Sequence, residues 1–181
     1  LAATLGALIA GGAPGVFVPG NNDYYRPLRP NLVGYLSADD PRRRRPDLPW
    51  DRAVRALETV GWTDLTHRRT ALAGLDVTLT GTDDAHLQRD RYARVAGPVA
   101  GDLAIGVTHT PQRRVLDAFV RDGYPLLLAG HTHGGQLRLP GLGAIITNCD
   151  LDRKRAKGLS KHLSADRVKD AYFAAHPRAR R

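Results

Sequence analysis

Two histidines, His131 and His133, stand two residues apart in the segment LLLAGHTHGGQ at residues 126–136. An apolar stretch precedes them, and glycines at 130, 134 and 135 flank them, so the backbone can turn tightly around both side chains. Imidazole is the most common side-chain ligand for borderline divalent metals. This pattern predicts that His131 and His133 bind metal, whereas the bare His-x-His spacing would equally describe two surface histidines.

Two other apolar stretches also run directly into polar residues. His109 follows the stretch at 103–107, and Asn21 and Asn22 follow the stretch at 15–19. Sites in α/β proteins are built from loops at the ends of buried strands. We therefore expect these loops to meet the histidine loop at one rim of a sheet, with His109 as a third metal ligand.

The remaining sequence supplies the elements that would position these loops. Apolar patterns predict an α/β domain with strands at 15–19, 75–80, 103–107, 125–129 and 142–147. Helices are expected at 1–10, at 50–60 with Asp51 as its N-cap, and between Pro111 and Gly123 with Val120 on its inward face. The proline-rich segment 24–49 is expected to be an exposed excursion.

The blocks GNND at 20–23, THTP at 108–111 and GHTHGGQ at 130–136 resemble, in kind and order, the last three motif blocks of the calcineurin-like metallophosphoesterases. Residues 147–149 and 156–158 are similar to a bacterial, membrane-associated branch of that family. The resemblance implies a partial four-layer α-β-β-α sandwich without its N-terminal strands. It would cover residues 1–160, with a separate basic tail at 161–181.

The resemblance also implies roles for individual residues. Asn21, His109 and His131 would bind one divalent ion, and His133 would bind another. The two ions (Mn, Fe or Zn) would activate a hydroxide for in-line attack on the phosphorus of a phosphate ester. A shift by one position would make Asn22 the ligand in place of Asn21, and the sequence leaves both assignments open.

Asn22 stands where the family has a histidine that stabilises or protonates the leaving group. Because an amide donates a hydrogen bond but is no general acid, we expect a preference for good leaving groups such as aryl phosphodiesters. His86, in a loop after a predicted strand, is the candidate substitute donor; a surface histidine is the alternative interpretation.

The family's first two blocks, Asp-x-His and Gly-Asp-x-x-Asp, do not occur among the 181 residues. The chain contains no Met and starts at Leu1, so we expect a C-terminal fragment, or a non-standard start codon read as Leu. With half of the site missing, the fragment is expected to be inactive. A non-catalytic remnant is the main alternative, whereas a metallo-β-lactamase-type site would continue with Asp and His after His133.

Composition limits the other classes of protein. Residues 151–181 hold 10 Lys and Arg against 3 Asp and Glu, so most of the net positive charge belongs to the tail and not to a face of the domain. A nucleic-acid-binding module that acts through this tail is the lesser alternative, and a solvated tail is the expectation. The single cysteine, Cys149, excludes an intrachain disulfide. The chain shows no targeting segment, and a membrane contact would require residues upstream of Leu1. We expect a cytoplasmic or membrane-associated protein, and the sequence gives no oligomeric state.

Overall fold

The computed structural model describes residues 2–12, 15–26, 46–72, 74–99, 101–132, 137–139, 143–146 and 149–152. These residues form a mixed α/β fold with few helices, a four-stranded mixed sheet and two two-stranded sheets. His133 and the basic tail at 161–181 lie outside the described residues. Among the described helices, none has the combination of length and apolar character needed to cross a bilayer.

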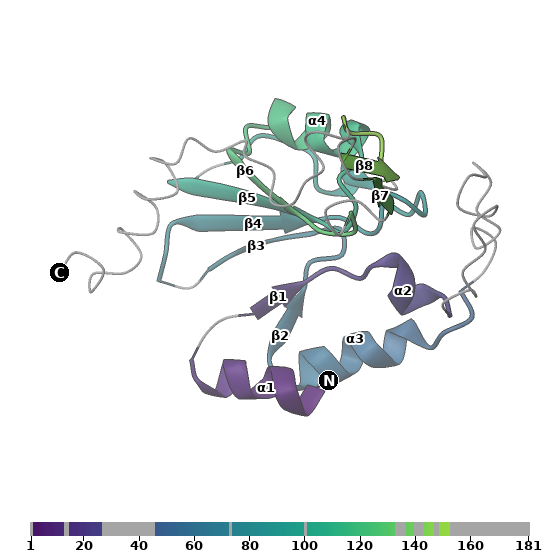
Figure 1. The fold of residues 1–181 in the computed structure, drawn as a ribbon. Coiled ribbons are helices and arrows are strands. Elements are labelled where there is room, and N and C mark those ends of the chain that lie inside the picture. The colour runs from purple at the N-terminus through teal and green to yellow at the C-terminus, as the bar shows by residue number, and fades with distance from the viewer. Residues whose placement is uncertain are drawn as a thin grey trace.

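The N-terminal part of the chain builds a small parallel sheet covered by two helices. Strand β1 (Gly15–Phe17) pairs with β2 (Trp62–Asp64), and the one-turn helix α2 (Asn21–Tyr24) begins shortly after β1. Helices α1 (Ala2–Ala10) and α3 (Trp50–Thr59) lie on the side of this pair that faces away from the larger sheet (Figure 1). The Trp62 indole donates a hydrogen bond to the carbonyl oxygen of Leu5, which ties α1 to β2.

The larger sheet has the order β3-β4-β5-β6, and its strands are β3 (Arg68–Ala71), β4 (Val77–Gly81), β5 (Leu103–Thr108) and β6 (Leu126–Ala129). Only β3 is antiparallel to its neighbour, so β4, β5 and β6 all end at the same edge. Helix α4 (Arg113–Arg121) connects β5 to β6 and buries Val115 and Phe119 against the sheet. A 3-10 turn η3 (Tyr92–Arg94) and the antiparallel pair β7 (Leu137–Leu139) and β8 (Gly143–Ile146) complete the described elements.

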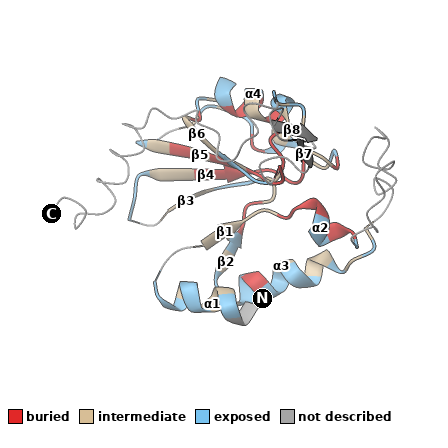
Figure 2. Cartoon of the chain, in the orientation of Figure 1, coloured by how far each residue is buried: buried red, intermediate tan, exposed pale blue. Residues whose placement is uncertain are grey.

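The two main sheets meet at Gly81, the last residue of β4. A Cβ atom at this position would lie 2.6 Å from the Cβ of Leu65 and 2.8 Å from Cγ1 of Val18, which no side chain tolerates. Glycine at this position therefore lets the chain after β1 and β2 pack directly on β4. Figure 2 shows buried residues along β4 and β5 and in α2, whereas α1 is mostly exposed.

Several local expectations are corrected. Asp51 does not cap α3; the helix already begins at Trp50, and Asp51 forms an ion pair with Arg55 one turn later. Val120 is 62% exposed, because the buried side of α4 is formed by Val115, Ala118 and Phe119. The strands β2, β3 and β7 were not predicted. Segment 24–49 was expected to be an exposed excursion, but its first residue, Tyr24, is buried.

His67 fixes the loop that follows β4. Its Nε2 atom accepts hydrogen bonds from the backbone N–H groups of Arg91, at 2.9 Å, and Asp83, at 3.4 Å. Burial lowers the pKa of His67, Asp83 opposes this, and the nearby Arg94 and Arg91 lower the pKa further. The folded chain therefore holds His67 neutral, with its lone pair committed to these donors.

This arrangement predicts an acid-dependent loss of stability. In the unfolded chain, His67 takes up a proton near its ordinary pKa of about 6.5. The contribution of His67 to the free energy of unfolding is therefore complete above that pH, and it is lost as the pH falls toward the lower pKa of the folded state. At pH 7.5 we expect His67→Gln to lower the free energy of unfolding by about 1 kcal/mol. Urea unfolding of both proteins between pH 5 and 8 should show this difference shrinking in acid, and a constant difference would contradict it.

Candidate metal centre

Three side chains from separate segments converge at the edge where β5 and β6 end. Nε2 of His109, just after β5, lies 3.2 Å from Oδ1 of Asn21, the first residue of α2. The same Nε2 atom lies 3.2 Å from Nδ1 of His131, which follows β6. Asn21 and His131 are each 7% exposed. The predicted meeting of the three loops is therefore confirmed, although β1 belongs to the smaller sheet.

These separations fit a shared cation. Two ligand atoms that each lie about 2.0–2.2 Å from one ion are about 3–3.5 Å apart in tetrahedral or octahedral geometry. If Nε2 of His109 carries a proton, Oδ1 of Asn21 and Nδ1 of His131 must share this one donor. If Nε2 instead carries a lone pair, that lone pair faces Oδ1 of Asn21, which is also an acceptor. A cation between the three atoms would accept a lone pair from each of them.

The backbone joins the two histidine loops to each other. The N–H of Gly130 donates to the carbonyl oxygen of His109 at 2.9 Å, which continues the pairing of β5 with β6 beyond the ends of the strands. His131 then adopts a left-handed conformation with φ of 66°, which is uncommon for residues other than glycine. Such backbone strain is often found at functional sites, where surrounding structure holds it.

Gly20 leaves the room that the His109 ring occupies. A Cβ atom at Gly20 would lie 2.5 Å from Cε1 of His109 and 2.7 Å from each ring nitrogen. The backbone of Gly20 is extended, with φ of −112°, so the requirement is one of space and not of backbone conformation. Glycine here is what allows the imidazole to approach Asn21.

The structure places the other predicted site residues differently. Asn22 is exposed, since neighbouring residues of a helix point in different directions. The half-buried ring of His86 packs against the ring of His131, with centroids 4.9 Å apart. His133 lies outside the described residues, so its predicted role as a ligand stays a prediction.

The candidate centre consists of two imidazoles and one amide. In the described part of the chain, no group of three or more His, Cys, Asp or Glu side chains could hold a metal ion. Imidazole nitrogen and amide oxygen together suit Mn, Fe or Zn, and they leave further coordination positions for water or other ligands.

Sequence reasoning missed four residues that support the segments of the candidate ligands. They are buried, and they link the loop after β4 to the two segments that carry Asn21 and His109: Tyr24, Asp83, Asp84 and Thr110. The available signal was a pair of adjacent aspartates in the loop that follows the alternating strand predicted at 75–80. Their partners are distant in the sequence, so no local pattern indicated what they contact.

Comparisons with protein-family models, with curated proteins and with solved structures find no match to this chain.

Proposed function

We propose that this chain carries one metal centre of a metal-dependent phosphoesterase, with Asn21, His109 and His131 as the ligands of a divalent ion. The observation that carries the proposal is the convergence of three potential ligand atoms, Nδ1, Nε2 and Oδ1, at successive distances of 3.2 Å. The ligands come from three segments whose motifs resemble those of the calcineurin-like metallophosphoesterases. Asn21 is preferred to Asn22 because it is buried beside His109, whereas Asn22 is exposed.

The layering of the fold supports the same proposal. Two helices, the β1–β2 pair, the four-stranded sheet and α4 follow one another through the molecule (Figure 1). This order agrees with part of an α-β-β-α sandwich. The Asp-x-His and Gly-Asp-x-x-Asp blocks, which would bind the second ion together with His133, are not among these residues.

When bound, a divalent ion would supply Lewis-acid chemistry toward a phosphoryl oxygen. Asn21, His109 and His131 would hold it at the end of the larger sheet. His86, which packs on His131, is the candidate hydrogen-bond donor to a bound phosphate ester, and Asn22 offers an exposed amide next to Asn21. A complete two-metal site that included these residues would act on phosphate esters, with preference for good leaving groups.

The proposal is tested by the binding of inorganic phosphate. In isothermal titration calorimetry, we expect phosphate to bind the chain loaded with Zn²⁺ and not to bind the metal-free chain. His131→Ala should abolish the heat of zinc binding and the heat of phosphate binding. Zinc binding without any phosphate binding would favour the alternative, a non-catalytic remnant.

Hydrolysis provides the second arm of this test. With Mn²⁺ and bis(p-nitrophenyl) phosphate we expect turnover at background, because three ligands to one ion make half of a two-metal site. Robust turnover that His131→Ala abolishes would overturn the half-site interpretation and establish a complete catalyst. An active form should cleave the aryl ester faster than an alkyl phosphodiester, and equal rates would argue against a weak hydrogen-bond donor at Asn22.

A further inference from the structure

Tyr24 anchors the short helix that carries Asn21. Its side chain is fully buried, with 0% exposure, and its hydroxyl donates a hydrogen bond of 2.6 Å to Oδ1 of Asp83. Burial and the neighbouring Asp83 carboxylate raise the pKa of Tyr24 above its ordinary value. Tyr24 therefore remains a hydrogen-bond donor throughout the range in which proteins function.

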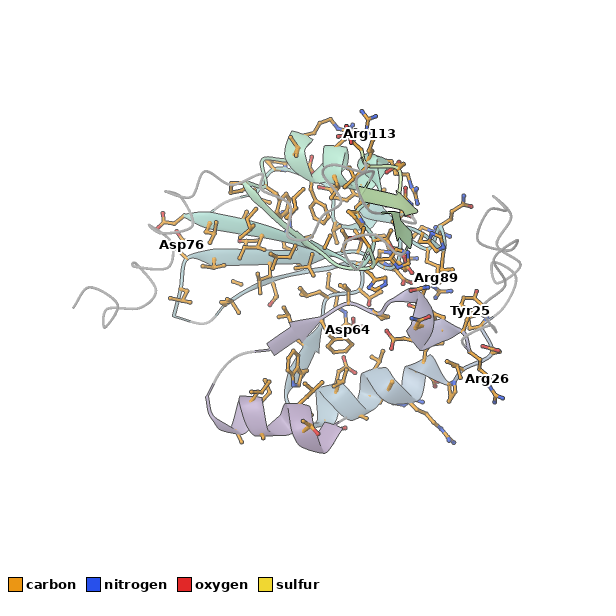
Figure 3. The ribbon with its side chains drawn as sticks, viewed as in Figure 1. Tyr25, Arg26, Asp64, Asp76, Arg89 and Arg113 are labelled. Atoms are coloured by element: carbon orange, nitrogen blue, oxygen red, sulfur yellow. The ribbon has the colours of Figure 1, made fainter. Side chains whose placement is uncertain are left out.

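Arg89 completes this anchor. Its Nε donates to Oδ2 of Asp83 at 2.9 Å, and its guanidinium carbon lies 4.1 Å from the centre of the Tyr24 ring. Figure 3 shows Arg89 beside α2. Trp50, at the start of α3, also packs against this cluster: its ring centre lies 5.2 Å from that of Tyr24 and 5.7 Å from the Arg89 guanidinium carbon. The buried charge of Asp83 is thus paired, and the position of Tyr24 is fixed from several directions.

The location of Asn21 follows from that of Tyr24. The two residues are three positions apart on a helix, so they lie on neighbouring parts of its surface. A helix of one turn has no stability of its own. The Asp23 carboxylate closes the turn by accepting from the N–H of Gly20, and the Tyr24–Asp83 hydrogen bond fixes the closed turn relative to the sheet.

Asp84 performs the corresponding task for His109. Its carboxylate is fully buried, and Oδ1 accepts hydrogen bonds of 2.8 Å from the hydroxyl of Thr110 and from the N–H of His86. Thr110 is the next residue after His109. The N–H of Asp84 also donates to Oδ1 of Asp83 at 2.7 Å, which couples the two aspartates.

We propose that Asp83 and Asp84 form the positioning element of the metal centre, in which Asp83 sets Asn21 through Tyr24 and Asp84 sets His109 through Thr110. The proposal rests on the metal centre proposed above. Neither aspartate is a ligand in this arrangement. Each acts through a buried hydroxyl on the segment that carries a ligand, so that one dipeptide after β4 aligns two ligands from different parts of the chain.

The experiment measures the affinity of the whole chain for Co²⁺ by its visible absorption. Tyr24→Phe keeps the ring and removes the hydroxyl, and we expect the affinity to fall about tenfold, as is typical when support for a ligand is lost. Tyr92→Phe is the matched control, because the Tyr92 hydroxyl also donates to a carboxylate, that of Asp122 at 2.7 Å, in a partly buried hydrogen bond, while the Tyr92 ring packs on Phe119. It should leave the affinity for Co²⁺ unchanged.

A double-mutant cycle separates positioning from general destabilisation. In an Asn21→Ala background, Tyr24→Phe should cause no further loss of affinity, because its effect passes through Asn21. Thr110→Val is the second test variant, and it should lower the affinity for Co²⁺ about tenfold. This loss should persist in the Asn21→Ala background, because Thr110 acts through His109.

Equal affinities of wild type, Tyr24→Phe and Thr110→Val would overturn the positioning role. A loss from Tyr24→Phe that persists after Asn21→Ala would overturn it as well. If the wild-type chain binds no Co²⁺, the proposed metal centre is contradicted, and so is the positioning element that depends on it. The two proposals therefore fail in different measurements.

Discussion

His109→Ala is expected to weaken the binding of a divalent metal by more than 100-fold. The Nε2 atom of His109 is the central donor of the proposed site, at 3.2 Å from Oδ1 of Asn21 and from Nδ1 of His131. Removing it leaves only Asn21 and His131 to hold the ion, and the loss should exceed the roughly 10–100-fold effect of removing a supporting residue. Competition of the chain with a chromophoric chelator for Zn²⁺ measures this change.

The two adjacent asparagines provide a matched comparison for this prediction. Asn21→Ala removes the oxygen beside His109 and should lower the affinity for Zn²⁺, whereas Asn22→Ala changes an exposed side chain and should leave the affinity as it is. The reverse result would make Asn22 the ligand. Retention of full zinc affinity by His109→Ala would contradict the assignment of all three ligands.

Gly20→Ala is expected to have the second largest effect, because the added methyl group must occupy the place of the His109 ring. The overlap, 2.5 Å to Cε1, involves a ring held in a packed site, so the ring has to move away from Asn21. We expect at least a tenfold loss of metal affinity and about 1–3 kcal/mol of lost stability from overpacking. Zinc competition and urea unfolding measure the two effects.

Gly130→Ala is the control for this substitution. Gly130 also lies beside the site, but a Cβ atom there would be 3.7 Å from the nearest atom outside its chain neighbours, the carbonyl oxygen of His109, which is an ordinary contact. Its φ is not positive, so alanine is not strained there. If both alanine variants lose affinity equally, the specific overlap of Gly20 with His109 is not the cause.

The parts of the site predictable from the sequence are those that depend on local pattern. An apolar strand followed by a polar loop identified His109, His131 and the Asn21–Asn22 pair, and parallel strands bring such loops to one edge. The order β4-β5-β6 bears this out for the two histidines. The sequence could not decide whether Asn21 or Asn22 faces His109, because this depends on helix α2. That helix has a single turn and is too short to leave a periodic pattern in the sequence.

The supporting residues could not be predicted in the same way. Tyr24 and Asp83 are 59 residues apart, and the hydroxyl that bonds Asp84 belongs to Thr110, 26 residues later. Their contacts depend on how two sheets pack, and no local periodicity encodes that packing. The exposure of Val120 has a similar origin, since it depends on how much of α4 the sheet covers.

The most direct measurement of the metal centre is X-ray absorption at the zinc edge of the zinc-loaded chain. We predict a first shell that contains two imidazole nitrogens at about 2.0–2.1 Å together with oxygen ligands. The His131→Ala variant should lose one imidazole from this shell. A first shell without imidazole, or a spectrum that His131→Ala leaves unchanged, would contradict the proposal that Asn21, His109 and His131 bind the ion.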